Sequence, residues 1–341
     1  METTKPLIRV LTTNVKQASL LWIEGFREAC CLHRVVLLCL RSRKLLIRTA
    51  QCFLLNGFIF LGSIFVLHSV VVPTLQWILP GQVSNISSQE ISSYGNILKL
   101  HSFLRSGLIQ LFYVFWFYPM YVFSIVLSAM WYNEIAKFGY DAMGRNEHNI
   151  VEPTSQNATP TTSSDTTLPT EKHAGLGGIM IGIGEQVYSI LLLSFFFLEV
   201  YATGVIPYIG KAINFILLSW MYAYYCFEYK WNLSEVSLDR RLDFFESNWA
   251  FFAGFGSPCV LAIFFFSSLV SYGVMAILFP LFVLTATSTG AEQDIFLQRM
   301  KWKGVGLGRL PIFYAADTVS MRILSLISSK SQHMMQDYKA L

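Results

Sequence analysis

Charged residues are scarce in this chain of 341 residues, of which 13% are charged and 54% are hydrophobic. Soluble domains carry roughly 25% charged residues, so the deficit is large. No charged residue occurs from 247 to 291, in a run rich in Phe and Leu. Because a membrane-spanning helix needs about 20 mostly apolar residues, this run is long enough for two passes. The scarcity of charge excludes a soluble globular protein and predicts an integral membrane protein, with the lipid bilayer as a partner.

Motifs of catalysis and metal binding are also missing. The six cysteines form no CxxC pair and no Cys/His spacing typical of a metal site, and the six histidines are scattered. No Asp falls within a hydrophobic region, which excludes a paired-aspartate intramembrane protease. No GxSxG, HExxH or Walker pattern is present. We therefore expect a protein that is not an enzyme and has no catalytic residue, cofactor, metal ion or nucleic-acid partner.

The first two hydrophobic regions predict two long transmembrane helices. Residues 52–79 and 106–133 contain no charge, and each region is long enough to cross a bilayer with some tilt. Trp77, Trp131 and Tyr132 lie where interfacial aromatic residues would anchor the ends of these helices.

The third and fourth regions each predict a helical hairpin. The third, 175–227, is interrupted at 207–210, and its charges leave stretches that are too short to span alone. The fourth, 247–291, is loosened at 267–273. The arms either cross fully or dip halfway and return, and a half-crossing hairpin favours a packed bundle or a homo-oligomer because its backbone needs partners. The residues expected to break up the fourth region are Gly254, Gly256, Pro258 and Pro280.

The predicted fold is therefore an all-α multi-pass membrane protein with two long transmembrane helices plus two helical hairpins, complete or re-entrant. Its integral membrane domain covers 51–295. At about 144–174 this domain contains a Thr-, Ser- and Pro-rich loop with too few apolar residues to order itself. A basic segment, 1–50, precedes the membrane domain, and a tail, 296–341, follows it.

Lys and Arg residues set the predicted orientation. Nine of the 25 precede Cys52 and seven follow Ala291, whereas only two separate the first two hydrophobic regions. The positive-inside rule then places both termini, the Thr/Ser-rich loop and a loop at 228–246 in the cytosol. Residues 1–48 have no uninterrupted apolar core, so we expect no signal peptide. The basic residues at 41–44 either contact anionic lipid or act only as an orientation signal.

The same orientation decides which sequons are eligible for glycosylation. Asn-x-Ser/Thr occurs at Asn85, Asn157 and Asn232. Only Asn85 lies in a predicted lumenal loop, so it is the single candidate, and we expect Asn157 and Asn232 to stay bare.

Three charged residues in the third hydrophobic region are the candidate intramembrane polar residues: Glu185, Glu199 and Lys211. The two glutamates are fourteen residues apart, nearly four turns, so they point to a similar side of one continuous helix. Charged groups in hydrocarbon are costly and usually face a cavity or a partner. These residues therefore either line an ion or proton path or lie near the interface on a shallow hairpin.

Several sequence blocks resemble one family of membrane proteins. They are WYNEIA at 131–136, YCFEYKW at 225–231, NW at 248–249 with a following GFG and a Pro, and ILFPLF at 277–282. Over about 50–295 the chain is similar to the etoposide-induced protein family of the endoplasmic reticulum membrane, a distant relation of the CysZ sulfate permeases. The residues that carry the resemblance are Trp131, Glu134, Tyr225, Glu228, Asn248, Trp249, Gly254, Gly256, Pro258 and Pro280.

The resemblance implies a non-enzymatic protein of the endoplasmic reticulum membrane that acts in autophagy, with cytosolic autophagy proteins as partners and links to growth control and apoptosis. Kinship with CysZ implies long transmembrane helices plus two half-membrane hairpins. It also implies an alternative function, an anion permease or channel for sulfate-like ions. No CysZ anion-binding motif matches residue by residue, and acidic residues such as Glu185 and Glu199 suit an anion poorly, so the role in autophagy is the leading hypothesis.

The C-terminus offers a candidate partner motif. Asp337 is followed by Tyr338 and, three residues later, by Leu341. This pattern resembles the motif that adds a strand to autophagy ubiquitin-like proteins, in which two side chains enter two pockets.

Overall fold

The computed structural model of the protein describes residues 4–78, 103–104, 106–150, 176–302 and 307–339. Every regular element in these ranges is a helix, which confirms the predicted all-α membrane fold. The helices form two compact units that are described separately. The first unit comprises 1–30, 143–260 and 289–341, and the second comprises 31–142 and 261–288.

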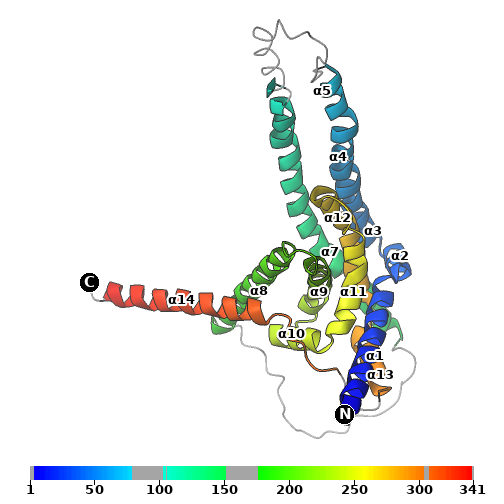
Figure 1. Ribbon diagram of the computed structural model, residues 1–341, viewed down its shortest axis with the longest axis vertical. Coiled ribbons are helices and arrows are strands. Elements are labelled where there is room, and N and C mark those ends of the chain that lie inside the picture. Colours follow the sequence, from blue (N-terminus) through cyan, green and yellow to red (C-terminus); the bar gives the residue numbers. More distant parts are fainter. Residues whose placement is uncertain (1–3, 79–102, 105, 151–175, 303–306, 340–341) are drawn as a thin grey trace, which may run out of the picture. The chain divides into compact units, whose positions relative to one another are not determined.

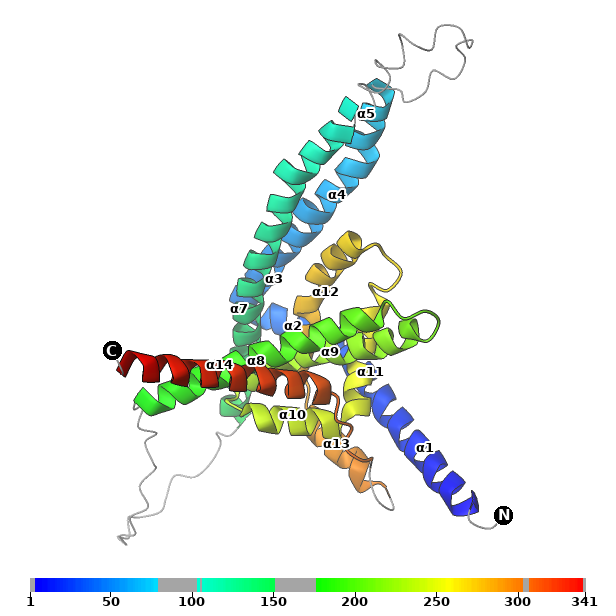
Figure 2. The ribbon, with the colours of Figure 1, turned by 60° about the vertical axis from the view of Figure 1, so that its left-hand side comes forward.

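The second unit contains the two predicted long transmembrane helices. Residues 43–74 form one apolar helix and residues 106–144 form another, and both are long enough to cross a bilayer. They run side by side in both views of the ribbon (Figures 1 and 2). α2 (Leu32–Arg41) precedes the first long helix. That helix is made of α3 (Arg43–Phe53), η1 (Leu54–Leu61), α4 (Gly62–Val66), η2 (Leu67–Val71) and α5 (Val72–Ile78). The second long helix ends with η3 (Tyr113–Phe117) and α7 (Tyr118–Ile150).

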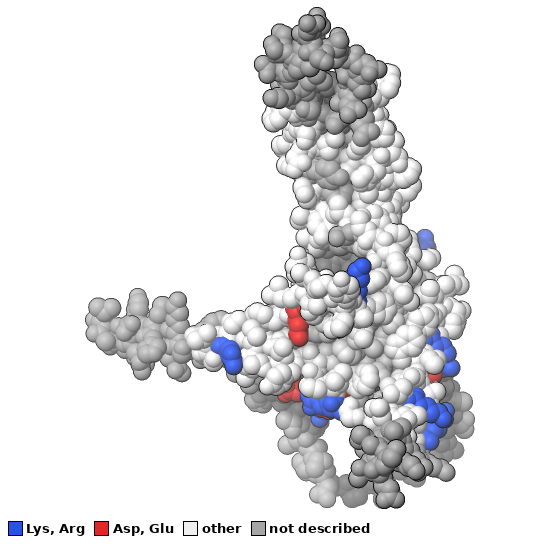
Figure 3. Space-filling model, in the orientation of Figure 1, with Lys and Arg blue, Asp and Glu red and all other residues white. Residues whose placement is uncertain are grey.

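The outward surface of these two helices is apolar. Phe58 is 79% exposed and Phe115 is 74% exposed. On the face drawn in Figure 3, no Lys, Arg, Asp or Glu colours the surface over α4, α5 and the start of α7. Exposing this apolar surface to water would cost free energy, whereas lipid tails solvate it. The surface therefore suits the hydrocarbon core of a bilayer.

The fourth hydrophobic region forms two helices, and the break between them differs from the predicted one. α11 (Trp249–Leu261) and α12 (Ser268–Ser288) are joined at 262–267. Gly254, Gly256 and Pro258 lie inside α11 and Pro280 lies inside α12, so the expectation that they cut the region into pieces is wrong. α12 is long enough to cross, whereas 13 residues of α11 reach only about 20 Å of a hydrocarbon core about 30 Å thick.

The third region is the predicted hairpin of the first unit. α8 (Leu176–Thr203) and α9 (Gly210–Leu233) pack together, and the expected break at 207–210 is confirmed, with Tyr208 at a left-handed φ of 63°. Residues 228–246, predicted as a loop, are mostly helical instead. The remaining elements of this unit are α1 (Thr4–Ala29), α10 (Leu238–Ser247), α13 (Ala291–Met300) and α14 (Tyr314–Lys339).

An aromatic core holds the first unit together. Tyr224 of α9 is fully buried, and its ring lies within 5.7 Å of the ring centroids of Trp231, Phe245 and Phe313. Phe245 also stacks on Phe252 of α11 at 4.2 Å. Edge-to-face and offset ring pairs add about 0.5–1.5 kcal/mol each beyond the area they bury. The core therefore joins α9, α10, α11 and the start of α14.

Three glycines let helices of the first unit touch at their backbones. A Cβ on Gly25 of α1 would overlap the carbonyl of Phe251, and a Cβ on Gly254 of α11 would overlap the carbonyl of Trp22. On the neighbouring side of α11, a Cβ on Gly256 would overlap the carbonyl of Ser219. α11 is thus held between α1 and α9 at distances that only glycine permits.

The Thr/Ser-rich loop begins later than predicted. α7 continues to Ile150, so the first residues of the expected loop are helical. The rest of the predicted loop, from 151 onward, lies outside the described residues, as does Asn157.

Candidate functional site

A polar cluster lies inside the transmembrane helices of the second unit. Asn56 of η1 is fully buried, and Ser124 and Ser128 of α7 are each 1% exposed. The Ser124 hydroxyl donates to Asn56 Oδ1 at 2.5 Å, and Asn56 Nδ2 donates to Ser128 Oγ at 2.9 Å. These bonds join the two long helices at a depth where water is not available, so each polar group depends on the others.

A proline in α12 supplies the third side of the cluster. Pro280 has no N–H, so the carbonyl of Ala276, four residues earlier, has no partner within its own helix. The Tyr132 hydroxyl donates to this carbonyl at 2.9 Å, and Asn56 Nδ2 lies 3.4 Å from it. The Cys52 thiol also points at it, at 3.9 Å. The helix continues past Pro280 because neighbouring helices satisfy the group that the proline leaves open.

The backbone around Asn56 is adapted to this cluster. η1 is π-helical over Leu54–Leu61, and such stretches often occur at functional sites. The cluster is uncharged and its members bond to one another, so its evident effect is to hold three helices in register. Sequence reasoning missed it because only charged residues were sought. The available signal was one Asn in an apolar run and two serines four residues apart, on one face of a helix.

Replacing Asn56 with leucine should destabilise the second unit by about 1–3 kcal/mol, because interhelical hydrogen bonds in membranes contribute roughly 0.6 kcal/mol each and up to about 1.7. Heating the detergent-solubilised chain with a thiol-reactive dye measures the change, since Cys52 is fully buried until the unit opens. Ser63→Ala is the control, because the Ser63 hydroxyl bonds only within its own helix, to Ile59. Equal melting of the two variants would contradict the role of the cluster.

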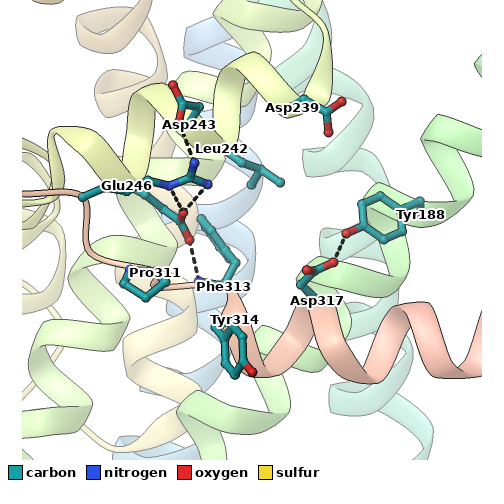
Figure 4. A pocket seen from close by; sticks show the side chains of 10 residues that line it. Tyr188, Asp239, Leu242, Asp243, Glu246, Pro311, Phe313, Tyr314 and Asp317 are labelled. Carbon is teal, nitrogen blue, oxygen red and sulfur yellow. Dashed lines mark hydrogen bonds and ion pairs between the residues drawn. The ribbon is translucent and has the colours of Figure 1, made fainter.

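A second polar site is a cavity of about 370 Å³ in the first unit (Figure 4). Glu246 is 4% exposed, and its Oε2 accepts from Arg309 Nε at 2.8 Å and Nη2 at 2.7 Å. Its Oε1 accepts from the backbone N–H of Phe313 at 3.0 Å. The cavity is lined by Tyr188, Asp239, Leu242, Asp243, Glu246, Arg309, Pro311, Phe313, Tyr314 and Asp317.

The electrostatics of this cavity are mainly acidic. The lining holds four carboxylates and one guanidinium. Arg309 also pairs with Asp243 at 2.7 Å, and the hydrogen bond to Glu246 raises the pKa of Arg309 above its ordinary value. The Tyr188 hydroxyl of α8 donates to Asp317 of α14. The carboxylates therefore tie α8, α10 and α14 together, and their charge suits a cationic group rather than an anion.

The structure does not bring the predicted intramembrane charges together. Glu185 and Glu199 lie on one continuous helix, α8, as expected, but the side chain of Glu185 is outside the described residues. Glu199 Oε2 is buried without a hydrogen-bond partner. Lys211 is exposed at the start of α9, and no ion pair joins it to Glu199 in the described part of the chain.

The residues that carry the family resemblance mostly hold helices together. Glu134 of α7 forms an ion pair with Arg48 of α3. The Trp249 indole N–H donates to Gly308 at 3.3 Å, and its carbonyl accepts from Trp220 at 2.9 Å. The Asn248 amide donates to Phe244 between α10 and α11. Others of this set lie in helix interiors: Trp131 in α7, Tyr225 and Glu228 in α9, Gly254, Gly256 and Pro258 in α11, and Pro280 in α12.

The remaining candidates fall at the edges of the described structure. Asp337 and Tyr338 lie in α14, whose helical backbone would have to unwind before it could add a strand to a partner. Leu341 and Asn85 lie outside the described residues. Among the residues that are described, no group of three or more His, Cys, Asp or Glu side chains is placed to hold a metal ion.

Comparison with known proteins decides the family. Residues 31–280 match the EI24 family, whose description is sulfate transporter CysZ/etoposide-induced protein 2.4. The chain belongs to the EI24 family. A protein EI24 homolog of Arabidopsis thaliana is 64% identical over 318 residues, which cover 93% of this chain and 98% of the homolog.

Other relatives of the EI24-family chain are more distant. A protein EI24 homolog of Dictyostelium discoideum is 27% identical over 308 residues, 90% of this chain and 84% of the homolog. Ectopic P granules protein 4 of Caenorhabditis elegans is 38% identical over 82 residues, 24% of this chain and 26% of that protein. No solved structure matches the chain. The matched range covers the whole second unit down to Pro280, so the Asn56 cluster lies within the family's own segment.

Proposed function

We propose that this EI24-family protein is a non-enzymatic membrane protein of the endoplasmic reticulum that acts in autophagy through cytosolic partners. Family membership carries the proposal. A Caenorhabditis elegans relative is named ectopic P granules protein 4, and this name is consistent with the proposed role. Both polar sites also support a structural rather than a catalytic part, because their side chains are engaged in joining helices.

The proposed contact with the autophagy machinery is the cytosolic C-terminus. α14 packs against α8 near the beginning of α14. Tyr338 lies in the last turns of the same helix. A short C-terminal helix end is weakly held, since helical hydrogen bonds are lost over its final turn. Unwinding of this end would present Tyr338 and Leu341 in the extended form that a ubiquitin-like partner binds by strand addition.

Cells that lack the protein and any paralogue should accumulate autophagy substrates and stall after initiation. Re-expression of the full chain should restore flux, and Tyr338→Ala should restore it only in part if the tail is the contact. The measurement is turnover of a lipidated autophagy marker with and without lysosomal inhibition. Normal flux in the knockout would contradict the role in autophagy, whereas full rescue by Tyr338→Ala would contradict only the tail contact.

An anion permease is the alternative, because the family description includes a sulfate transporter. The described residues argue against it. The side chains of the polar cluster at Asn56 bond to one another, and the carboxylate of half-buried Glu199, whose Oε2 has no hydrogen-bond partner, would repel an anion. Sulfate flux into liposomes that contain the purified chain separates the two functions. Flux above that of empty liposomes would favour the permease.

A further inference from the structure

The chain turns sharply just before its first transmembrane helix. α2 ends at Arg41, and Ser42 has an extended backbone, with φ −119° and ψ 105°. The Ser42 hydroxyl caps α3 by accepting from the N–H of Leu45 at 3.4 Å, while its own N–H closes α2 on the carbonyl of Leu38 at 3.0 Å. α2 is therefore a separate helix at the point where the chain enters the membrane.

The side chains of α2 fall into three sectors around its axis. At about 100° per residue, one sector packs against α3 and α12, a second is apolar and exposed, and a third between them is basic. The exposed apolar side chains are large: Leu37 is 63% exposed and Leu40 is 73% exposed. The packed sector is Val35, Leu38 and Cys39, the exposed apolar sector is Leu32, Val36, Leu37 and Leu40, and the basic sector is Arg34 and Arg41.

Three cations gather at the turn between α2 and α3. Arg41, Arg43 and Lys44 are all exposed, and none has an ion-pair or hydrogen-bond partner in the described part of the chain. One turn further on, Arg48 is paired with Glu134 and contributes no uncompensated charge. The three unpaired cations thus lie beside an exposed apolar stripe and at the start of a spanning helix.

We propose that α2 lies in the plane of the membrane and that Arg41, Arg43 and Lys44 bind the headgroups of anionic phospholipids. The exposed apolar stripe enters the acyl boundary, and the basic edge stays level with the phosphates, which is the arrangement of interfacial amphipathic helices. Basic clusters next to a transmembrane helix attract anionic lipid, and arginine can bind a phosphate with two parallel hydrogen bonds. The stripe assigns the anion to a lipid, because a soluble phosphate would leave Leu37 and Leu40 in water.

The test is titration of the detergent-solubilised full chain with short-chain phosphatidylserine. Each basic side chain near such a surface contributes about fivefold, so the triple variant Arg41→Gln, Arg43→Gln, Lys44→Gln should lose roughly a hundredfold in affinity. The matched control is Arg240→Gln, Lys301→Gln, Arg322→Gln, which removes the same charge from exposed positions elsewhere and should change little. Equal affinities of the two triple variants would overturn the proposal, as would displacement of the lipid by inorganic phosphate at similar concentration.

A second measurement does not depend on those variants folding. A nitroxide placed at Leu40→Cys, with the exposed Cys30 and the half-buried Cys31 changed to serine, reports its depth in lipid nanodiscs. In-plane binding predicts strong relaxation by oxygen and weak relaxation by a water-soluble nickel chelate. The same label at Arg240→Cys should show the reverse. Relaxation of the Leu40 label mainly by the nickel chelate would place α2 in water and overturn the proposal.

Discussion

Alanine at Gly256 should destabilise the first unit by about 3 kcal/mol, because overpacking of a closely fitted interface costs roughly 1–3 kcal/mol and more where nothing can yield. The atoms that an alanine Cβ would meet are the backbone carbonyl and Cα of Ser219, not the end of a flexible side chain. α9 and α11 must therefore move apart, and the aromatic core between them must open. Gly254→Ala should act similarly against Trp22 of α1.

The control for this prediction has the opposite sign. Gly62 also lies in a helix, but a Cβ there would meet nothing within 4 Å. Gly62→Ala should therefore stabilise the chain by about 0.5–1 kcal/mol, since alanine loses less backbone entropy on folding. Thermal unfolding in detergent measures each variant. Dye labelling of the buried Cys226 and Cys259 follows the first unit, which holds Gly256, and labelling of the buried Cys52 follows the second unit, which holds Gly62. If Gly256→Ala and Gly62→Ala melt alike, the helices do not touch at their backbones.

A double variant probes the crossing of α1 and α11 directly. Gly25 of α1 faces the backbone of α11 at Phe251, and Gly254 of α11 faces the backbone of α1 at Trp22. Once one alanine has pushed the helices apart, the second meets less resistance, so the losses of Gly25→Ala and Gly254→Ala should sum to more than the loss of the double variant. Such coupling is characteristic of neighbouring positions and would be absent if the two glycines acted through separate contacts.

The long helices and the third-region break were predictable because their signals are local. The charge-free residues of 52–79 and 106–133 need no partner to be recognised as spanning segments, and Pro207 with Gly210 marks a turn within its own segment. The same local reading was wrong for Gly254, Gly256 and Pro280. Glycine and proline break helices in water. Within a membrane bundle, neighbouring helices pack closely against the glycine or donate a hydrogen bond to the carbonyl that the proline leaves open, and those neighbours lie far away in the sequence.

The candidate sites were less predictable for the same reason. Ser124 is 68 residues from Asn56, and Arg309 is 63 residues from Glu246. Each of these side chains is ordinary in its own segment, and only the packing of the helices gives it a partner. Charge within the hydrophobic regions pointed to Glu185, Glu199 and Lys211, which the structure does not assemble. Uncharged Asn56, and Glu246 just before the fourth hydrophobic region, acquire several partners each.

Replacing Glu246 with alanine should destabilise the attachment of α14 by about 1–3 kcal/mol. The variant leaves the buried N–H of Phe313 without its acceptor, and an unsatisfied buried donor costs that much. The lost ion pair adds little, because the Arg309 side chain is 54% exposed and water screens it. The backbone carbonyl of Glu246 still accepts from Leu310 at 3.1 Å, so the segment before α14 should loosen rather than detach.

Hydrogen exchange of the full chain in detergent is the measurement, read over 307–326 against the rest of the first unit. Asp243→Asn is the matched control, since Asp243 contacts the same arginine but its side chain is 63% exposed, and its loss should change exchange by less than a factor of about three. Glu246→Gln should fall between the two, because its amide oxygen still accepts one hydrogen bond. If Glu246→Ala and Asp243→Asn exchange alike, the exposed ion pair and not the buried acceptor holds this segment in place.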